Sequence, residues 1–165
     1  MKSKFRRVAL LSALIITLIL AGTAYAGGSD FKDAGTLNSP DYSWAVSDIA
    51  LATDVGLIRG YPDGTFQPGN TITRAEFSAM MQRALDKWEG QVSPFGDVPR
   101  DAWFTMYVDV LVASGVIKQS DYGSTLKPDE PITRKEIASW TARAAGLYGA
   151  DAGDGELKFS DYTGD

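Results

Sequence analysis

The chain of 165 residues contains neither cysteine nor histidine. The lack of cysteine excludes disulfides and thiolate sites, and the lack of histidine excludes histidine-ligated zinc, Ser-His-Asp triads and Cys-His dyads. Any enzyme built from this chain would have to use carboxylates, Lys, Tyr, Ser or Thr. Glycosidase chemistry, for example, needs two carboxylates across a sugar cleft, and none of the 21 acidic residues falls in a recognisable catalytic constellation. We therefore predict no enzymatic activity, no metal site and no cofactor.

A long hydrophobic run is also missing, except near the start of the chain. A basic stretch with four Lys or Arg residues precedes an apolar run of 13 residues at 8–20, and Ala24-Tyr25-Ala26 follows as a small-residue cleavage site. This pattern predicts a secretory signal peptide over residues 1–26. The alternative is an uncleaved membrane anchor, but a full span needs about 20 apolar residues. We expect no stable membrane span after cleavage.

Positive charge is scarce in the rest of the chain. Removal of residues 1–26 leaves 12 basic against 21 acidic residues, a net charge of −9. Such a surface repels the phosphates of nucleic acids at long range, so we predict no nucleic-acid partner. An anionic partner would need a local cluster of Arg or Lys.

An internal repeat organises what remains. Ile-Thr-Arg-Ala-Glu at 72–76 returns as Ile-Thr-Arg-Lys-Glu at 132–136, and a Trp stands 12 residues before a Gly in each copy. A Phe-x-Asp triplet occurs at 31–33, 95–97 and 159–161, in steps of 64. A unit of this length cannot bury an apolar face alone, so neighbouring units must share one core.

Each repeat is predicted to fold as helix, loop and helix. The first helices are expected at about 41–55 and 102–114, each ended by a glycine. The second helices are expected to begin after Thr73 and Thr133, where Glu76 and Glu136 complete Thr-x-x-Glu capping boxes. The apolar stripes predicted to face the core are Phe77, Met80, Met81, Ala84, Leu85 and Trp88, and Ile137, Trp140, Thr141, Ala144, Ala145 and Tyr148. The predicted fold class is all-α.

These motifs, in this order, resemble the S-layer homology family. Repeat one carries Phe-x-Asp, Trp-Ala, Gly-Leu-Ile-x-Gly-Tyr-x-Asp-Gly-Thr-Phe-x-Pro and Ile-Thr-Arg-Ala-Glu. Repeat two keeps most of these markers, but its loop is one residue longer and lacks the Gly-Tyr pair. The resemblance implies tandem helix-loop-helix repeats in a pseudo-threefold helical bundle. It divides the chain into a signal peptide (1–26), repeat one (27–90), repeat two (91–155) and the truncated start of a third repeat (156–165).

The resemblance also implies non-covalent anchoring at the bacterial cell surface, with a secreted protein held at the cell wall, S-layer or cell envelope. Its expected partner is a secondary cell-wall polysaccharide, often pyruvylated, or a peptidoglycan-linked glycan. The arginine of Ile-Thr-Arg-x-Glu is a usual contact to the ketal carboxylate in the family. Carried onto this chain, the candidate binding residues are Arg74, Arg134, Asp33, Asp97, Trp44, Trp103 and Gly60.

The chemistry of these residues fits an anionic sugar. A guanidinium binds a carboxylate with two parallel hydrogen bonds, free amides at a helix N-terminus favour an anion, and an indole suits the apolar face of a pyranose. Each candidate also has a purely structural interpretation. The capping boxes could serve only the helices, the two Trp could belong to the core, and the aspartates could cap a turn or the first helix.

Two other interpretations stay open at this point. The repeats could mediate self-assembly of a surface lattice or attachment to peptidoglycan, with a cargo domain beyond residue 165. The acid-rich segment 151–156 hints at calcium but lacks the ligand spacing of an EF-hand loop, which favours a linker.

Overall fold

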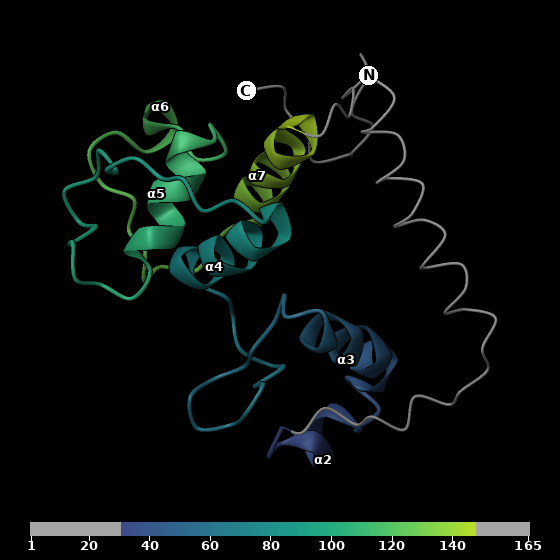
Figure 1. The fold of residues 1–165 in the computed structure, drawn as a ribbon. Helices are drawn as coiled ribbons and strands as arrows, with labels where there is room; N and C mark the ends of the chain where they lie inside the picture. The colour runs from purple at the N-terminus through teal and green to yellow at the C-terminus, as the bar shows by residue number, and fades with distance from the viewer. Residues whose placement is uncertain (1–30, 148–165) are drawn as a thin grey trace, which may run out of the picture.

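A computed structural model describes residues 31–147, so the predicted signal peptide, the acid-rich segment and the predicted start of a third repeat lie outside the described residues. The elements, in chain order, are α2 (Ala34–Leu37), a 3₁₀-helix η1 (Ser43–Ala45), α3 (Val46–Asp54), α4 (Arg74–Leu85), α5 (Thr105–Ala113), α6 (Gln119–Tyr122) and α7 (Arg134–Leu147) (Figure 1). Within this range there is no β-strand, only an isolated bridge between Thr73 and Pro131. The predicted all-α fold class is confirmed.

The first helix of each repeat is shorter than predicted at its start. α3 begins at Val46 behind η1, and α5 begins at Thr105. The N-cap residues Tyr42 and Phe104 have no side-chain hydrogen bond to a helix amide. The preceding backbone is instead used in turns, so a regular helix cannot start as early as the hydrophobic pattern suggested.

The predicted glycine stops of these helices are confirmed. Gly56 and Gly115 have φ values of 75° and 74°. The amide of Gly56 donates to Thr53 and that of Leu57 donates to Ala52, and the equivalent pair of bonds closes α5 at Gly115. This is the Schellman arrangement, in which a left-handed residue lets two amides satisfy the last helix carbonyls.

The predicted apolar stripe of α4 is wrong in both phase and length. The helix ends at Leu85, Ala84 is exposed, and Trp88 is 66% exposed beyond the helix end. The buried face instead includes the polar residues Ser78 and Gln82. The Ser78 hydroxyl donates to the carbonyl of Arg74 and the Gln82 amide donates to that of Lys87, so both polar side chains tolerate burial.

The stripe predicted on α7 is confirmed only in part. Trp140 and Ala144 are buried, Thr141 and Ala145 are exposed, and Tyr148 lies outside the described residues. The exposed pair does not contact another described helix in the way that the pattern suggested.

One hydrophobic core joins α4 of repeat one to the whole of repeat two. It consists of Ala75, Met81, Leu85, Phe95, Val98, Phe104, Val108, Leu111, Val116, Ile117, Leu126, Ile132, Trp140 and Ala144. No residue of α2, η1 or α3 belongs to it, and Leu37, Ile49 and Ala50 are buried separately. Figure 1 accordingly shows α4, α5 and α7 gathered together, with α2 and α3 on one side.

Candidate functional site

The two Phe-x-Asp aspartates hold the loops of their own repeats. The Asp33 carboxylate accepts the amides of Phe66 and Gln67 at 2.9 and 2.8 Å, and the Asp97 carboxylate accepts those of the equivalent residues 126 and 127 at 2.8 and 2.7 Å. Burial raises the pKa of Asp33, but the two amides outweigh it and lower that pKa below its ordinary value. Asp33 stands at the N-cap of α2 without a side-chain capping bond. Its carboxylate therefore fixes the loop conformation.

Gly60 lies where the loop of repeat one crosses Phe31. Its φ is +66°, and a Cβ atom at this position would lie 2.4 Å from Phe31 Cε1 and 2.6 Å from the carbonyl oxygen of Thr65. The next amide, from Tyr61, donates to that same carbonyl at 2.8 Å. Only glycine fits both the left-handed backbone and the close approach.

Both capping boxes are present in the structure. Glu76 Oε2 accepts from the amide and hydroxyl of Thr73, and the Glu76 amide donates back to the Thr73 hydroxyl at 3.2 Å. The same three hydrogen bonds join Thr133 and Glu136 at the start of α7. In both boxes, Oε2 is the oxygen used for capping.

Arg74 joins the two repeats. Its Nε donates to Glu136 Oε1 at 2.7 Å, its Nη1 donates to the carbonyl of Lys127 at 3.2 Å, and the guanidinium lies 5.7 Å from the Tyr122 ring centroid. Nη1 also lies 3.5 Å from Glu130 Oε2, and only 11% of the Arg74 side chain is exposed. Two of the guanidinium nitrogens are therefore already engaged by the protein.

The amides at the start of α4 are not free for an anion, contrary to the sequence-based expectation. The amide of Arg74 donates to the carbonyl of Glu130 at 3.0 Å, and that of Ala75 donates to the carbonyl of Pro128 at 2.9 Å. The segment that precedes α7 thus satisfies the amides that would otherwise attract a ligand.

Glu136 is the most perturbed carboxyl among the described residues. Burial alone raises its pKa, but hydrogen bonds from Arg74, Thr133 and Tyr122 outweigh this and hold the pKa at about 2. The pKa of Tyr122 is raised, first by burial and then by the Glu136 carboxylate. Arg74, Glu136 and Tyr122 therefore form one charged, hydrogen-bonded cluster between the repeats.

Arg134 has the same place in its motif but a different environment. It is exposed at the first position of α7 and has no side-chain partner within residues 31–147. Two residues with identical predicted roles are thus placed differently, Arg74 inside an interface and Arg134 on the surface.

Both predicted tryptophans lie on the surface. Trp44 is 76% exposed and its Nε1 donates to the carbonyl of Asp41, while Trp103 is 61% exposed and packs edge-on against Phe104 and Tyr107. The alternative that they fill the core does not describe this structure.

A groove of about 780 Å³ brings Gly60 and Trp103 together from the two repeats. Its walls are the loop of repeat one, one side of α4 and the indole of Trp103. The lining residues are Ile58, Arg59, Gly60, Tyr61, Pro62, Phe66, Gln67, Pro68, Asn70, Thr71, Ile72, Glu76, Ala79, Met80, Arg83 and Trp103. Arg74, Arg134, Asp33, Asp97 and Trp44 do not line it. We call this cavity the repeat-one groove.

Sequence reasoning missed Arg59 and Arg83 as groove residues. Arg83 donates to the carbonyl of Leu57 at 3.3 Å and lies 5.6 Å from the Tyr107 ring centroid, which fixes it in the groove wall. Its repetition as Arg143 was visible in the sequence, and Arg143 makes the equivalent bond to Val116 at 3.0 Å. Arg59 is exposed, and the position carried no signal before the groove was known.

The altered loop of repeat two restores the tyrosine that its sequence seemed to lack. Its extra residue is accommodated by α6, which ends at Tyr122. Tyr122 hydrogen bonds to Glu136, as Tyr61 hydrogen bonds to Glu76, where burial and then this carboxylate raise the pKa of Tyr61. Each repeat therefore has a tyrosine against its capping glutamate.

Two further features were examined over residues 31–147. In that range no three acidic side chains come together in a way that could hold a metal ion, and no helix is both long and apolar enough to span a bilayer.

The model of the S-layer homology domain family matches residues 39–78 and 94–138. The chain is 36% identical over 129 residues to the cellulosome-anchoring protein of Acetivibrio thermocellus, covering 71% of this chain and 28% of that protein. It is 31% identical over 114 residues to exoglucanase XynX of the same species, covering 68% and 10% of the two chains. It is 30% identical over 125 residues to the surface-layer 125 kDa protein of Lysinibacillus sphaericus, covering 72% and 11%. The chain thus spans less than a third of the length of each of these relatives.

Proposed function

This chain belongs to the S-layer homology family of cell-surface proteins, and we propose that it anchors its protein by binding a cell-wall glycan in the repeat-one groove. The observation that carries the proposal is that Gly60 and Trp103, predicted from different repeats, line one cavity of about 780 Å³. The proposed ligand is a secondary cell-wall polysaccharide or a peptidoglycan-linked glycan. The role proposed for these repeats is binding without catalysis, although relatives such as exoglucanase XynX are named as enzymes.

The lining of the groove suits a sugar ring with an anionic substituent. Trp103 and Tyr61 offer aromatic faces for the apolar side of a pyranose. Arg59 is exposed at the groove and can bind a carboxylate, such as that of a pyruvate ketal, with two hydrogen bonds. This local cation would overcome the general repulsion from a chain with excess acidic residues.

Of the two motif arginines, Arg134 is the better candidate for a direct glycan contact. Its guanidinium is exposed, whereas Arg74 is engaged by Glu136 and the Lys127 carbonyl. We propose that Arg74, Asp33 and Asp97 position the loops and repeats around the ligand, and that Trp44 lies outside the groove.

The test is co-sedimentation of the purified protein with cell-wall sacculi before and after removal of the secondary polysaccharide. Binding should disappear with the polysaccharide and should weaken about tenfold in Trp103→Ala and in Arg59→Ala, equivalent to about 1.4 kcal/mol for each lost contact. Trp44→Ala is the matched control, because it removes an equally exposed indole outside the groove. Persistent binding to stripped sacculi, or equal losses for the two Trp variants, would contradict the proposal.

The second candidate function is self-assembly of a surface layer. The observation that favours it is an inter-repeat contact whose two halves are exposed elsewhere on the chain, which is developed below.

A further inference from the structure

The contact between the two repeats has a polar and an aromatic part. Arg74 of α4 donates to Glu136 of α7 at 2.7 Å. One turn along, the Phe77 ring lies 5.9 Å from the Trp140 ring. Glu136 and Trp140 thus form the surface of repeat two on which α4 of repeat one docks.

The same contact has an aliphatic part, made between α4 and α5. Met81 and Leu85 of α4 are only 8% and 4% exposed, because they belong to the core shared with repeat two. Val110 of α5 is 1% exposed. Charge pairing and apolar burial therefore act together in this contact.

The half that repeat one contributes returns uncovered on α7. Arg134, Ile137, Thr141 and Ala145 stand 60 residues after Arg74, Phe77, Met81 and Leu85. Three of them are exposed and Ile137 is half-buried. We call these four residues the α7 surface.

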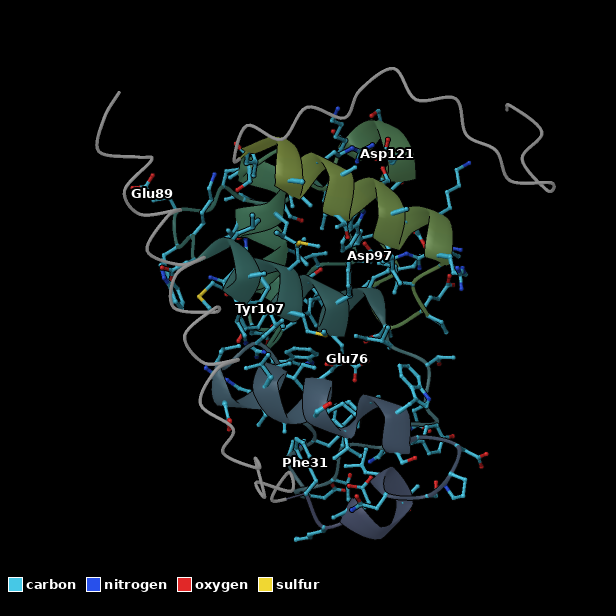
Figure 2. All side chains as sticks on the ribbon, turned by 90° about the vertical axis from the view of Figure 1, so that its right-hand side faces the viewer. Phe31, Glu76, Glu89, Asp97, Tyr107 and Asp121 are labelled. Atoms are coloured by element: carbon cyan, nitrogen blue, oxygen red, sulfur yellow. The ribbon has the colours of Figure 1, made fainter. Side chains whose placement is uncertain are left out.

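The half that repeat two contributes returns uncovered on repeat one. Leu51, Glu76 and Met80 correspond to Val110, Glu136 and Trp140. Leu51 is 54% exposed and Met80 lines the repeat-one groove, whereas both counterparts are 1% exposed. Glu76 lies on the side of α4 that faces α3 (Figure 2), so the three residues share one region. We call them the repeat-one surface.

We propose that the α7 surface of one copy of the chain docks on the repeat-one surface of a second copy. Arg134 then donates to Glu76 as Arg74 donates to Glu136, and Ile137 packs on Met80 as Phe77 packs on Trp140. The occupant is a second copy because the contact within the chain already shows which side chains fit this surface. The charges are complementary as well, with an exposed guanidinium meeting a carboxylate that lacks an arginine partner among the described residues.

The resulting interface is heterologous, because the two surfaces differ. Copies joined in this way form head-to-tail rings or filaments rather than closed symmetric pairs. Glu76 and Met80 also line the repeat-one groove, so a docked copy borders the proposed glycan site. The proposal does not depend on glycan binding, and its test contains no glycan, so either proposal can fail alone.

Sedimentation velocity of the purified chain over a concentration series is the test. We expect species larger than a monomer whose share grows with concentration. Arg134→Glu and Leu51→Glu should each raise the dissociation constant at least about tenfold, the first by placing like charges together and the second by burying a charge. Lys118→Glu is the control, since it makes the same charge change as Arg134→Glu at an exposed site on neither surface.

A mixture of Arg134→Glu with Glu76→Arg sharpens the test. Each variant alone places like charges together and should stay monomeric, while the mixture should form 1:1 dimers that grow no further. Circular dichroism checks that Glu76→Arg folds without its capping carboxylate, and Leu51→Glu tests the same surface without touching the cap. A monomeric wild type up to about 1 mM, unchanged association in Arg134→Glu and Leu51→Glu, or folded variants that do not pair would overturn the proposal.

Discussion

At the scale of single residues, the motif arginines show how environment divides one chemistry into two roles. Arg74 has its Nε on a carboxylate that is itself partly buried, and its guanidinium covers the Tyr122 ring. Removing one member of such a pair costs more than the net contribution of the contact, because the remaining carboxylate keeps its desolvation penalty. Arg134 has no such partner within the described range, so its removal leaves nothing unpaired there.

We therefore expect Arg74→Ala to lower the free energy of unfolding by about 1–3 kcal/mol at pH 7. Arg134→Ala, the same change in the same motif, should stay within about 0.5 kcal/mol of the wild type, as exposed substitutions usually do. Urea denaturation followed by circular dichroism measures both. Equal losses for the two variants would show that Arg74 does not hold the repeats together.

Acid should weaken the protein through Glu136. Its pKa is lowered in the folded state from 4.5 to about 2, so the stabilisation is fully present above pH 4.5 and is lost as the pH falls toward 2. Thermal melting between pH 5 and pH 2 should show this decline. In Arg74→Ala the pKa of Glu136 is depressed less, so the gap between variant and wild type should narrow across the same interval. A constant gap would contradict the assignment.

At the scale of elements, each loop is fixed by a few backbone bonds to a conserved geometry rather than by hydrophobic packing. The carboxylates of Asp33 and Asp97 each receive two successive amides, and in each pair the second residue, Gln67 or Lys127, has a positive φ. A non-glycine residue in this region is strained, so it needs such external bonds to persist. The groove wall therefore depends on contacts 30 or more residues apart in sequence.

Gly60→Ala tests this dependence. The new methyl group would approach both Phe31 and the Thr65 carbonyl within 2.6 Å, so we expect a loss of about 2 kcal/mol or more together with weaker binding to sacculi. Gly56→Ala is the matched control, because its φ is +75° but no atom lies within 4 Å of the new methyl group. Its cost should be limited to backbone strain of about 1 kcal/mol. Thermal melting of both variants makes the comparison.

At the scale of the whole molecule, the repeat boundary in sequence is not the boundary of the core. α4 belongs to repeat one by sequence but packs with α5 in the core of repeat two. The segment from α2 to α3 lies outside that core, with only Leu37, Ile49 and Ala50 as its own buried apolar residues. A segment that buries little apolar surface opens at a smaller free-energy cost than the main core.

Hydrogen exchange followed by mass spectrometry should therefore separate two levels of protection. Amides of α3 should exchange faster than those of α5, although the two helices are the same length and occupy equivalent positions in their repeats. Docking of a second copy on Leu51 should slow exchange in α3 at high protein concentration. Equal protection of α3 and α5 in dilute solution would mean that α3 is part of the main cooperative unit.

The sequence by itself determined the repeat, the helix stops, the capping boxes and the all-α class. These features are local, because a cap acts within three residues and a left-handed glycine closes the turn beside it. The loop of repeat two shows the limit of such reading. Its tyrosine is displaced by one position in the motif, and only the turn of α6 returns it to the capping glutamate.

Only the tertiary structure decided which motif residues face a ligand and which face the protein. Arg74 and Arg134 are identical in their local sequence signal, but α7 lies against the first and no described element lies against the second. The burial of Ser78 and Gln82, the exposure of both tryptophans and the meeting of Gly60 with Trp103 likewise depend on how the repeats pack. Long-range packing sets the environment of each side chain, and a periodic pattern records only which residues share a face.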